Sequence, residues 1–333
     1  MYIDVAKGIG MSMIVWMHIW GNNTFGFTPP QTLNSLIRTI YVPVFFVLSG
    51  FLLEIQDLDL RKEITKKAKS LLRPFAIVYL FSFSISVFLD MVGFKAKHEF
   101  EWINFLSPLY SKTFFNGPIW FLLALFWAFT IYYCIMKLCK GKEQYVVVST
   151  LCISLVGFNL HRWGITLPLF FGQGMVASSM LMMGSEIRKY LMPVFVSNSS
   201  NRRMTIICFI LCFGIYLLFR QNLGFQENIF DGHFPVFMIG VFGGSLMILC
   251  FSFLLEKYLS LFAYWGRFSL VVLCLHNFIL IPISKITGVL VGNSIFWAIL
   301  NFVMIYMVFM GIIPLVTKLC PGLFNIKKQN GIL

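Results

Sequence analysis

Charged residues are scarce in this chain, and acidic residues are the scarcest of them. Asp, Glu, Lys and Arg together make up 12% of the 333 residues, with 13 acidic and 26 basic side chains. Apolar residues make up 59%, and the mean hydropathy is +0.83. So few charges cannot cover the surface of a soluble fold that must also bury this much apolar sequence. The composition therefore excludes a soluble globular protein and predicts a polytopic membrane protein.

Features of several other protein classes are also missing. The eight cysteines show no CxxC spacing and lie mostly in apolar stretches, so we expect neither a disulfide framework nor a metal site. The first apolar segment lacks the basic n-region and the small-residue cleavage site of a signal peptide, and we expect it to remain as a span. Without a repeat, a low-complexity tract or a long linker, residues 1–333 are expected to form a single transmembrane domain.

Ten apolar stretches are long enough, or nearly long enough, to cross a bilayer, which takes about 20 helical residues. They cover residues 4–23, 36–56, 73–94, 116–136, 145–160, 165–187, 204–220, 233–254, 268–284 and 294–317. The expected fold is all-α, a polytopic membrane helix bundle of about ten transmembrane helices.

The basic residues give the orientation, because they favour the cytoplasmic side of a membrane. In the ten-span arrangement, eighteen Lys and Arg residues fall in segments on the side of both termini and six on the other side. We therefore expect both termini in the cytoplasm, which an even number of spans requires. The net charge of +13 lies mostly in short loops beside apolar helices. Positive-inside bias and attraction to anionic lipid explain most of this charge. The expected partner is therefore the lipid bilayer, and we expect no nucleic-acid partner.

The most informative segment is DVAKGIGMSMIVWMH, residues 4–18, because it carries ionisable groups on an apolar helix. Lys7 and His18 are eleven residues apart and project within about 20° of each other, with Asp4 about 40° beyond His18. Their separation of about 16 Å along the axis places His18 near the membrane midplane. An ionisable group there is costly to bury and indicates function. The alternative interpretation of His18 is a structural histidine that forms a hydrogen bond between helices. Asp4, three residues before Lys7, is expected to orient the Lys7 side chain.

His276 is a second histidine expected near the midplane. It lies nine residues beyond Arg267, which is about 13 Å of helical rise, and Asn277 follows it. Two histidines at similar depth could face one cavity. Alternatively, His276 is a neutral imidazole bonded to a neighbouring carbonyl, since Asn277 already suggests a polar contact between helices.

Other positions have both a structural and a functional interpretation. Ser49-Gly50 favours close approach of another backbone, and Glu54 is expected to pair with a lysine or to snorkel. Trp120 is expected near the outer interface, where an aromatic belt is favoured and stacking on a sugar ring is the alternative. A basic group before the third span is explained by positive-inside bias and equally suits a polyphosphate. Its members are Lys66, Lys67, Lys69 and Arg73.

Together these segments resemble the acyltransferase-3 family of bacterial membrane O-acyltransferases, sometimes described with the fucose 4-O-acetylase-like proteins. The opening resembles the family's Asp-x-x-Arg/Lys-Gly leader, with a histidine eleven residues after the basic position. Later segments resemble its Pro-x-Phe-Phe-x-x-Ser-Gly-Phe element, its Trp-Phe-Leu segment, its Gly-x-x-x-Arg helix end and its late Ser-to-His helix. These segments read YVPVFFVLSGFLL, GPIWFLLALF, MLMMGSEIRK and WGRFSLVVLCLHNFIL.

The resemblance implies transfer of an acyl group, usually acetyl, from cytoplasmic acetyl-CoA to a sugar hydroxyl. The acceptor would be a lipid-linked or cell-surface polysaccharide such as O-antigen (lipopolysaccharide) or capsule, and the location the bacterial cytoplasmic (inner) membrane. His18 would be the catalytic histidine, as general base or transient acyl carrier, with Lys7, Asp4 and His276 near it.

The resemblance also implies binding residues. Arg73, Lys69, Lys67 and Lys66 are expected to bind the phosphates of acetyl-CoA. Trp120, Ser49 and Asn116 are expected to bind the acceptor. Two positions depart from the family pattern: Lys7 stands where most members have arginine, and Ser70 replaces the first arginine of an Arg-x-x-Arg pair, where Lys69 could substitute.

Two other function classes fit a chain with many spans and few midplane polar groups. A transporter or lipid-linked glycan flippase is the main alternative, but there is no internal repeat, and Asp90 and Glu186 lie close to predicted helix ends. A membrane regulator without catalysis would tolerate loss of His18, whereas an enzyme would not.

Overall fold

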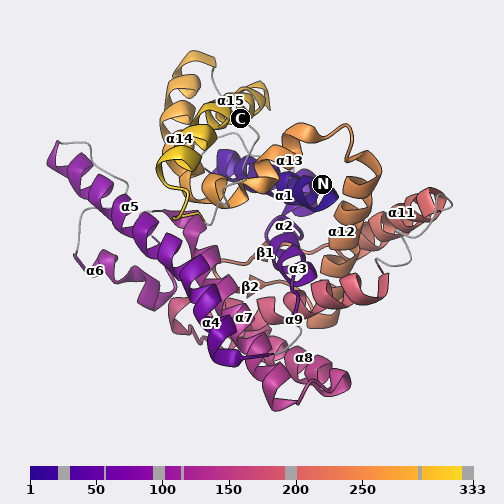
Figure 1. Ribbon diagram of the computed structural model, residues 1–333. Helices are drawn as coiled ribbons and strands as arrows, with labels where there is room; N and C mark the ends of the chain where they lie inside the picture. The colour runs from indigo at the N-terminus through magenta and orange to yellow at the C-terminus, as the bar shows by residue number, and fades with distance from the viewer. Residues whose placement is uncertain are drawn as a thin grey trace.

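Helices make up nearly all of the regular structure in the computed structural model (Figure 1). It describes residues 1–21, 31–55, 58–92, 102–113, 116–191, 201–291 and 295–324, so the predicted span ends at 22–23, 56, 93–94 and 294 lie outside the described residues. The α-helices are α1 (Tyr2–Gly21), α2 (Gln31–Arg38), α3 (Pro43–Phe51), α4 (Leu60–Lys67), α5 (Arg73–Met91), α6 (Trp102–Phe105), α7 (Trp120–Leu138), α8 (Glu143–Asn159), α9 (Phe171–Glu186), α11 (Asn201–Phe219), α12 (Phe234–Leu255), α13 (Ser260–Arg267), α14 (Ser269–Val291) and α15 (Ile295–Leu319).

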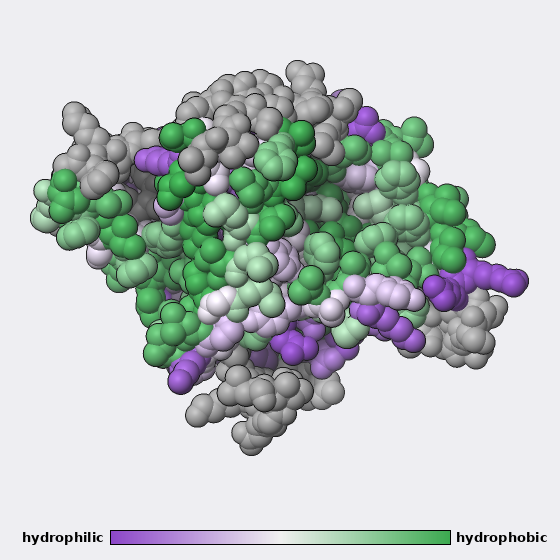
Figure 2. Space-filling model, turned by 90° about the horizontal axis from the view of Figure 1, so that it is seen from above, coloured by the Kyte–Doolittle hydropathy of each residue, from purple (hydrophilic) through white to green (hydrophobic). Residues whose placement is uncertain are grey.

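Six helical segments within the described ranges are long and apolar enough to cross a membrane. They are Leu60–Met91, Gly117–Leu138, Arg202–Phe219, Phe234–Leu255, Ser269–Val289 and Ile295–Leu319. Three of them bury only 17–22% of their most apolar window, so most of their apolar side chains point outward. Figure 2 shows the same property on one face of the molecule, where apolar side chains cover most of the described surface. Such a surface is suited to hydrocarbon, and the protein is a multi-pass integral membrane protein.

The predicted span over 36–56 is an apolar helical stretch at Ser35–Phe51, which is shorter than predicted and is interrupted by a turn. A turn at 39–42 separates α2 from α3, and α3 starts at Pro43. Proline has no N–H to give to a preceding turn, so it begins a helix more readily than it continues one. Thr39 also uses its hydroxyl outside the helix, donating to the Gln221 carbonyl at 2.5 Å and accepting from the Gln221 N–H at 2.9 Å. With nine residues, α3 is about 13 Å long and does not cross a bilayer by itself.

α1 lies in the middle of the bundle, against α12, α13, α14 and α15 (Figure 1). Its backbone touches that of α13 directly at two glycines. A Cβ on Gly8 would lie 1.8 Å from the Phe262 carbonyl oxygen, and one on Gly266 would lie 1.7 Å from the Asp4 carbonyl oxygen. Only glycine permits this approach, so the two positions fix α1 against α13.

The Ser49-Gly50 step packs as its composition predicts. A Cβ on Gly50 would lie 1.9 Å from the Leu181 carbonyl oxygen of α9, and one on Gly184 would lie 1.9 Å from the Val47 carbonyl oxygen of α3. Small residues thus bring the two helices into backbone contact. Ser49, beside Gly50, faces an internal cavity.

Candidate active site

One face of α1 lines two cavities inside the bundle. Lys7, Met11, Ile14 and His18 follow one another at helical spacing along this face. His18 lines the larger cavity, of about 520 Å³, and Lys7 lines the smaller one, of about 180 Å³. We call these the outer and the inner cavity. Lys7 and His18 therefore share one helix face, as predicted, but open into different spaces.

His18 and His276 are brought together by the packing of α1 against α14. Their ring centroids are 5.0 Å apart, with 51° between the ring planes. His276 is fully buried, and its Nδ1 lies 2.9 Å from the Val272 carbonyl oxygen. Because a carbonyl only accepts, Nδ1 carries the proton in this arrangement. The Nε2 atom is buried without a partner and keeps a free lone pair.

The predicted bond of His276 to a neighbouring carbonyl is confirmed, whereas only His18 of the two histidines lines the outer cavity. The neighbouring carbonyl holds one ring nitrogen, and the second ring nitrogen is unsatisfied beside another histidine. An unsatisfied buried nitrogen costs free energy, which is tolerated where it serves chemistry. The catalytic roles of both histidines stay predictions.

Asn116 fixes the start of α7 to the histidine helix. Its side-chain amide donates to the Cys274 carbonyl at 2.9 Å, two residues before His276, and the residue is only 2% exposed. Pro118, in the short 3₁₀ helix Gly117–Ile119 that follows, lines the outer cavity. Asn116 thus has a structural contact, and its predicted role in acceptor binding stays a prediction.

Trp120 is not part of an interfacial belt, which was the favoured interpretation. The side chain is 5% exposed and packs in an aromatic cluster, with Phe170 at 5.7 Å and Phe225 at 6.0 Å between ring centroids. Part of Trp120 lines the outer cavity, beside Phe121. The indole is thus rigidly held at the cavity wall, where an aromatic face can stack on a sugar ring.

A short β-hairpin forms much of the wall of the outer cavity, and the sequence analysis did not predict it. Strands β1 (Leu223–Gly224) and β2 (Ile229–Phe230) pair antiparallel between α11 and α12. Seven residues from this hairpin and its flanks line the cavity: Asn222, Leu223, Gly224, Gln226, Glu227, Ile229 and Asp231. Four of the seven have polar side chains, Asn222, Gln226, Glu227 and Asp231, and they add to the polar groups of His18, Arg38 and Tyr41 in this cavity.

Side chains from distant helices hold the hairpin in place. Asn228, whose φ of 57° forms the turn, donates its amide to the Gly157 carbonyl at 2.9 Å. Gln173 donates to the Gln226 carbonyl at 2.7 Å, and Arg162 donates to the carbonyls of Phe230 and Gly232. Two-residue strands are unstable alone, so these bonds preorganise the cavity wall.

The inner cavity has mostly apolar walls. Lys7, Ser49 and Ser269 are its polar lining residues. Asp4 lies three residues before Lys7, but the two side chains form no ion pair in the described structure. The expectation that Asp4 orients Lys7 stays a prediction.

The four basic residues around α4 and α5 do not line the inner cavity, although Leu71, which lies between Lys69 and Arg73 in the chain, does. A π-helical turn, Ala68–Leu72, joins the two helices, and its Leu71 reaches the cavity wall. Lys67 lies over the Phe129 ring of α7, with Nζ 3.6 Å from the ring centroid. The other three basic side chains are exposed: Lys66, Lys69 and Arg73. Their predicted contact with acetyl-CoA stays a prediction.

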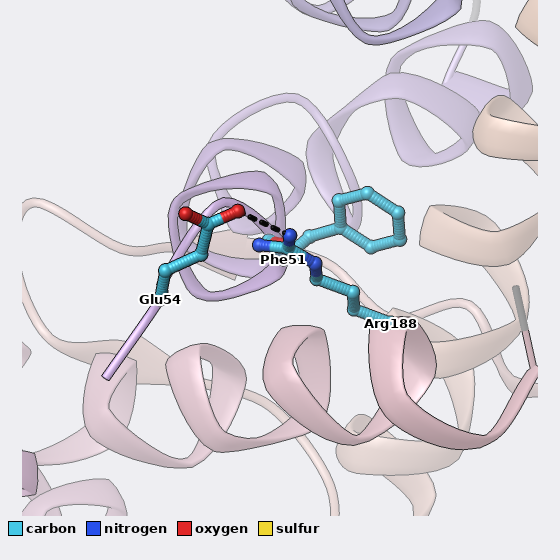
Figure 3. Close-up of polar contacts among 3 residues, drawn as sticks. All are labelled: Phe51, Glu54 and Arg188. Atoms are coloured by element: carbon cyan, nitrogen blue, oxygen red, sulfur yellow. Dashed lines mark hydrogen bonds and ion pairs between the residues drawn. The ribbon is translucent and has the colours of Figure 1, made fainter. Parts of the chain in front are cut away.

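Arg188 links the end of α9 to the end of α3 (Figure 3). Its guanidinium donates to the Glu54 carboxylate at 2.5 Å and to the Phe51 carbonyl at 3.4 Å. Glu54 thus pairs with an arginine, where a lysine was expected. The hydrogen bond and charge of Arg188 lower the pKa of Glu54. Together with the backbone contact at Gly184, this gives the Gly-x-x-x-Arg segment a structural role in joining α3 to α9.

The apolar helices and the buried histidine pair define a class: an integral membrane protein with acid–base groups inside its helix bundle. The family model described as an acyltransferase domain matches residues 1–319. The chain belongs to the acyltransferase-3 family. A search of curated proteins and a search of solved structures found no match. Membership indicates acyltransferase activity and does not favour the transporter alternative.

Proposed function

We propose that the protein is a membrane O-acyltransferase that moves an acetyl group from cytoplasmic acetyl-CoA to a sugar hydroxyl of a lipid-linked or cell-surface polysaccharide, such as O-antigen or capsule. The observation that carries this proposal is the contact between His18 and His276 at the wall of the outer cavity. Family membership supports acyl transfer. The polar residues of the β-hairpin and its flanks, which line the outer cavity together with His18, suit a hydroxyl-bearing acceptor.

The reaction needs a group that removes a proton from a hydroxyl near neutral pH, and imidazole meets this need. A ring nitrogen of His18 takes the proton as the hydroxyl oxygen attacks the thioester carbonyl carbon. The ester C–O bond forms, the C–S bond breaks, and the proton passes to the departing CoA thiolate. In the alternative order, His18 first carries the acyl group and the hydroxyl then removes it.

His276 acts through His18 in this proposal. Its Nδ1 proton is held by Val272, so Nε2 can accept an N–H from the neighbouring imidazole. Such a bond would set which nitrogen of His18 stays free to act as the base. His276 is therefore a positioning residue, because the fully buried ring does not line the cavity.

We place both termini in the cytoplasm of a bacterial inner membrane, with about ten crossings. The inner cavity then lies on the cytoplasmic side of the histidines and the β-hairpin on the outer side. Acetyl-CoA would approach from the side of Lys7, with its phosphates bound by Lys66, Lys67, Lys69 and Arg73. The glycan would enter the outer cavity beside Trp120, with Asn116 at the start of α7. Ser49 lines the inner cavity and would contact an acceptor only if the hydroxyl reached past the boundary between the cavities. No metal takes part.

Labelled acetyl-CoA tests the proposal in membranes that contain the acceptor glycan. The wild type is compared at matched expression with His18→Ala and with His161→Ala, a control at an exposed histidine outside both cavities. We expect alkali-labile label in the glycan for the wild type and the control, and none for His18→Ala. Undiminished label in His18→Ala would overturn the assignment of the base. No label with any protein would favour a transporter or a different donor.

A further inference from the structure

The two cavities share three wall residues, one from each of three helices. Ile14 of α1, Phe121 of α7 and Leu273 of α14 line the outer cavity and the inner cavity alike. We call them the apolar ring. On one side of this ring lies Lys7, and on the other lies His18. The two cavities therefore adjoin at these three side chains, which lie on the direct path from the inner cavity to His18.

The ring lies one helical turn from both histidines. Ile14 precedes His18 by four residues, and Leu273 precedes His276 by three, so each lies about 5 Å from its histidine along the helix axis. Lys7 is seven residues further back, about 10 Å of rise. The order along α1 is therefore a cationic group, the apolar ring and then the base.

The ring is held tightly by its neighbours. Its side chains are only 5–8% exposed. The Phe121 ring packs against Phe45 at 6.0 Å and Phe46 at 4.8 Å between centroids. Close-packed side chains move little, so they leave little room between the two cavities. The structure thus has a tightly packed apolar boundary between the cavity of Lys7 and the cavity of His18.

The inner cavity is small as well as apolar. Its volume of about 180 Å³ is close to that of an engineered apolar cavity of about 150 Å³ that binds benzene. The acetyl thioester end of acetyl-CoA suits such a space, whereas a long acyl chain does not. Apolar walls also keep water away from a thioester before the acceptor is in place.

We propose that the apolar ring of Ile14, Phe121 and Leu273 selects the acyl group, admitting a short acyl thioester to the histidines and holding back longer ones. This inference rests on the proposed acyl transfer and assigns its acyl specificity to three residues. The ring touches the passing acyl group and takes no part in proton transfer.

Acyl transfer from acetyl-CoA, butyryl-CoA and hexanoyl-CoA tests the ring directly. The wild type is expected to use acetyl-CoA best. Leu273→Ala and Ile14→Ala widen the space between the two cavities, and we expect each to reduce the preference for acetyl over butyryl at least ~10-fold, as expected for discrimination of methylene groups by an apolar pocket. Hydrolysis of acetyl-CoA without acceptor should rise in the same variants. General loss of folding lowers all three transfer rates together and does not shift their ratio.

Leu280→Ala is the matched control, because Leu280 is a buried leucine on the same helix as Leu273 and lines neither cavity. Its acyl preference should remain that of the wild type. An equal change of preference in Leu280→Ala, or an unchanged preference in both ring variants, overturns the role of the ring while acyl transfer stands.

Binding of the same three thioesters to purified His18→Ala protein, with and without Leu273→Ala, keeps the test independent of catalysis. Tighter binding of acetyl-CoA than of hexanoyl-CoA, with a smaller difference after Leu273→Ala, supports the ring. Equal binding of both thioesters to His18→Ala alone counts against it. If none of the three CoA thioesters binds, both the proposed function and the inference drawn from it are contradicted.

Discussion

The imidazole rings of His18 and His276 lie 5.0 Å apart, yet only His18 faces the outer cavity. His276 is fully buried behind it, with one ring nitrogen bonded and the other unsatisfied. A substrate in the cavity can touch the first ring and not the second. The two histidines should therefore have different kinetic effects when they are replaced.

Replacement of His276 by asparagine should lower kcat without changing either KM. Because His276 orients the base and does not touch the acceptor, we expect kcat to fall about 10²-fold, against a loss of about 10²–10⁴-fold or more for His18→Ala. Steady-state kinetics with varied acetyl-CoA and varied acceptor separate these effects. An increase in the acceptor KM for His276→Asn would show direct contact with the substrate.

Lys7→Ala should weaken the use of acetyl-CoA, because it removes the cationic group of the inner cavity. We expect the KM for acetyl-CoA to rise about 10-fold, and Lys7→Arg to retain most of the affinity, since arginine keeps the charge. Lys285→Ala, at an exposed lysine outside both cavities, is the control. Equal KM values for Lys7→Ala and the wild type would place the donor elsewhere.

Glu227→Gln and Arg162→Gln test the hairpin in two ways. Glu227 lines the outer cavity, so loss of its charge should raise the acceptor KM severalfold and leave acetyl-CoA binding unchanged. Arg162 is outside the cavity but bonds two hairpin carbonyls, and its loss should raise the acceptor KM by loosening the wall. Steady-state kinetics with varied acceptor give the acceptor KM of each variant, and a separate binding measurement gives its affinity for acetyl-CoA. A changed affinity for acetyl-CoA in either variant would contradict this division of the site.

Gly184→Ala should destabilise the protein strongly. The new Cβ would lie 1.9 Å from the Val47 carbonyl oxygen, so α3 and α9 must separate, at a cost of about 1–3 kcal/mol or more. Gly214→Ala on α11 is the matched control, because nothing lies within 4 Å of its new methyl group and alanine favours the helix. Thermal unfolding in detergent compares the two. Equal melting temperatures would show that the helices are not in backbone contact.

The pair of Glu54 and Arg188 should make stability depend on pH below neutrality. Arg188 lowers the pKa of Glu54 in the folded protein, so the pair stabilises above the unfolded pKa of about 4.3. That contribution is lost as the pH falls through the folded pKa. The difference in melting temperature between the wild type and Glu54→Gln should therefore shrink below about pH 4.3. A difference that stays constant from pH 7 to pH 3.5 would contradict the pairing.

The positions of most helices could be predicted, because membrane-length apolar runs leave few alternatives. Counting residues along their helices predicts a similar height for the two histidines, and their place near the midplane stays a prediction. Their contact could not be predicted in this way, since it depends on how α1 packs against α14. Pro43 signals the break between α2 and α3 in the sequence. Hydropathy averaged over a window of membrane-span length does not register a single proline.

The hairpin and Trp120 were missed for different reasons. Two-residue strands carry no periodic pattern, and this pair depends on bonds from Arg162 and Gln173, far away in sequence. Its turn did contain Asn228, a residue type that tolerates positive φ. Trp120 was assigned to the membrane interface by its place at a span end, but the hairpin and the short 3₁₀ segment before α9 cover it.

The contact between Gly8 and Gly266 also anchors the helices that carry the two histidines. At this contact α13 runs antiparallel to α1, because Gly8 lies against Phe262 and Gly266 lies against Asp4. The chain then reverses at the break at Phe268, and α14 follows α1 to the contact between His276 and His18. His18 lies ten residues after Gly8 on one unbroken helix, so insertion of one residue between them should move its imidazole by about 1.5 Å and turn it by about 100°. An insertion at the break beside Phe268 should be absorbed by the turn, so the histidine pair tolerates a change of chain length on one side only.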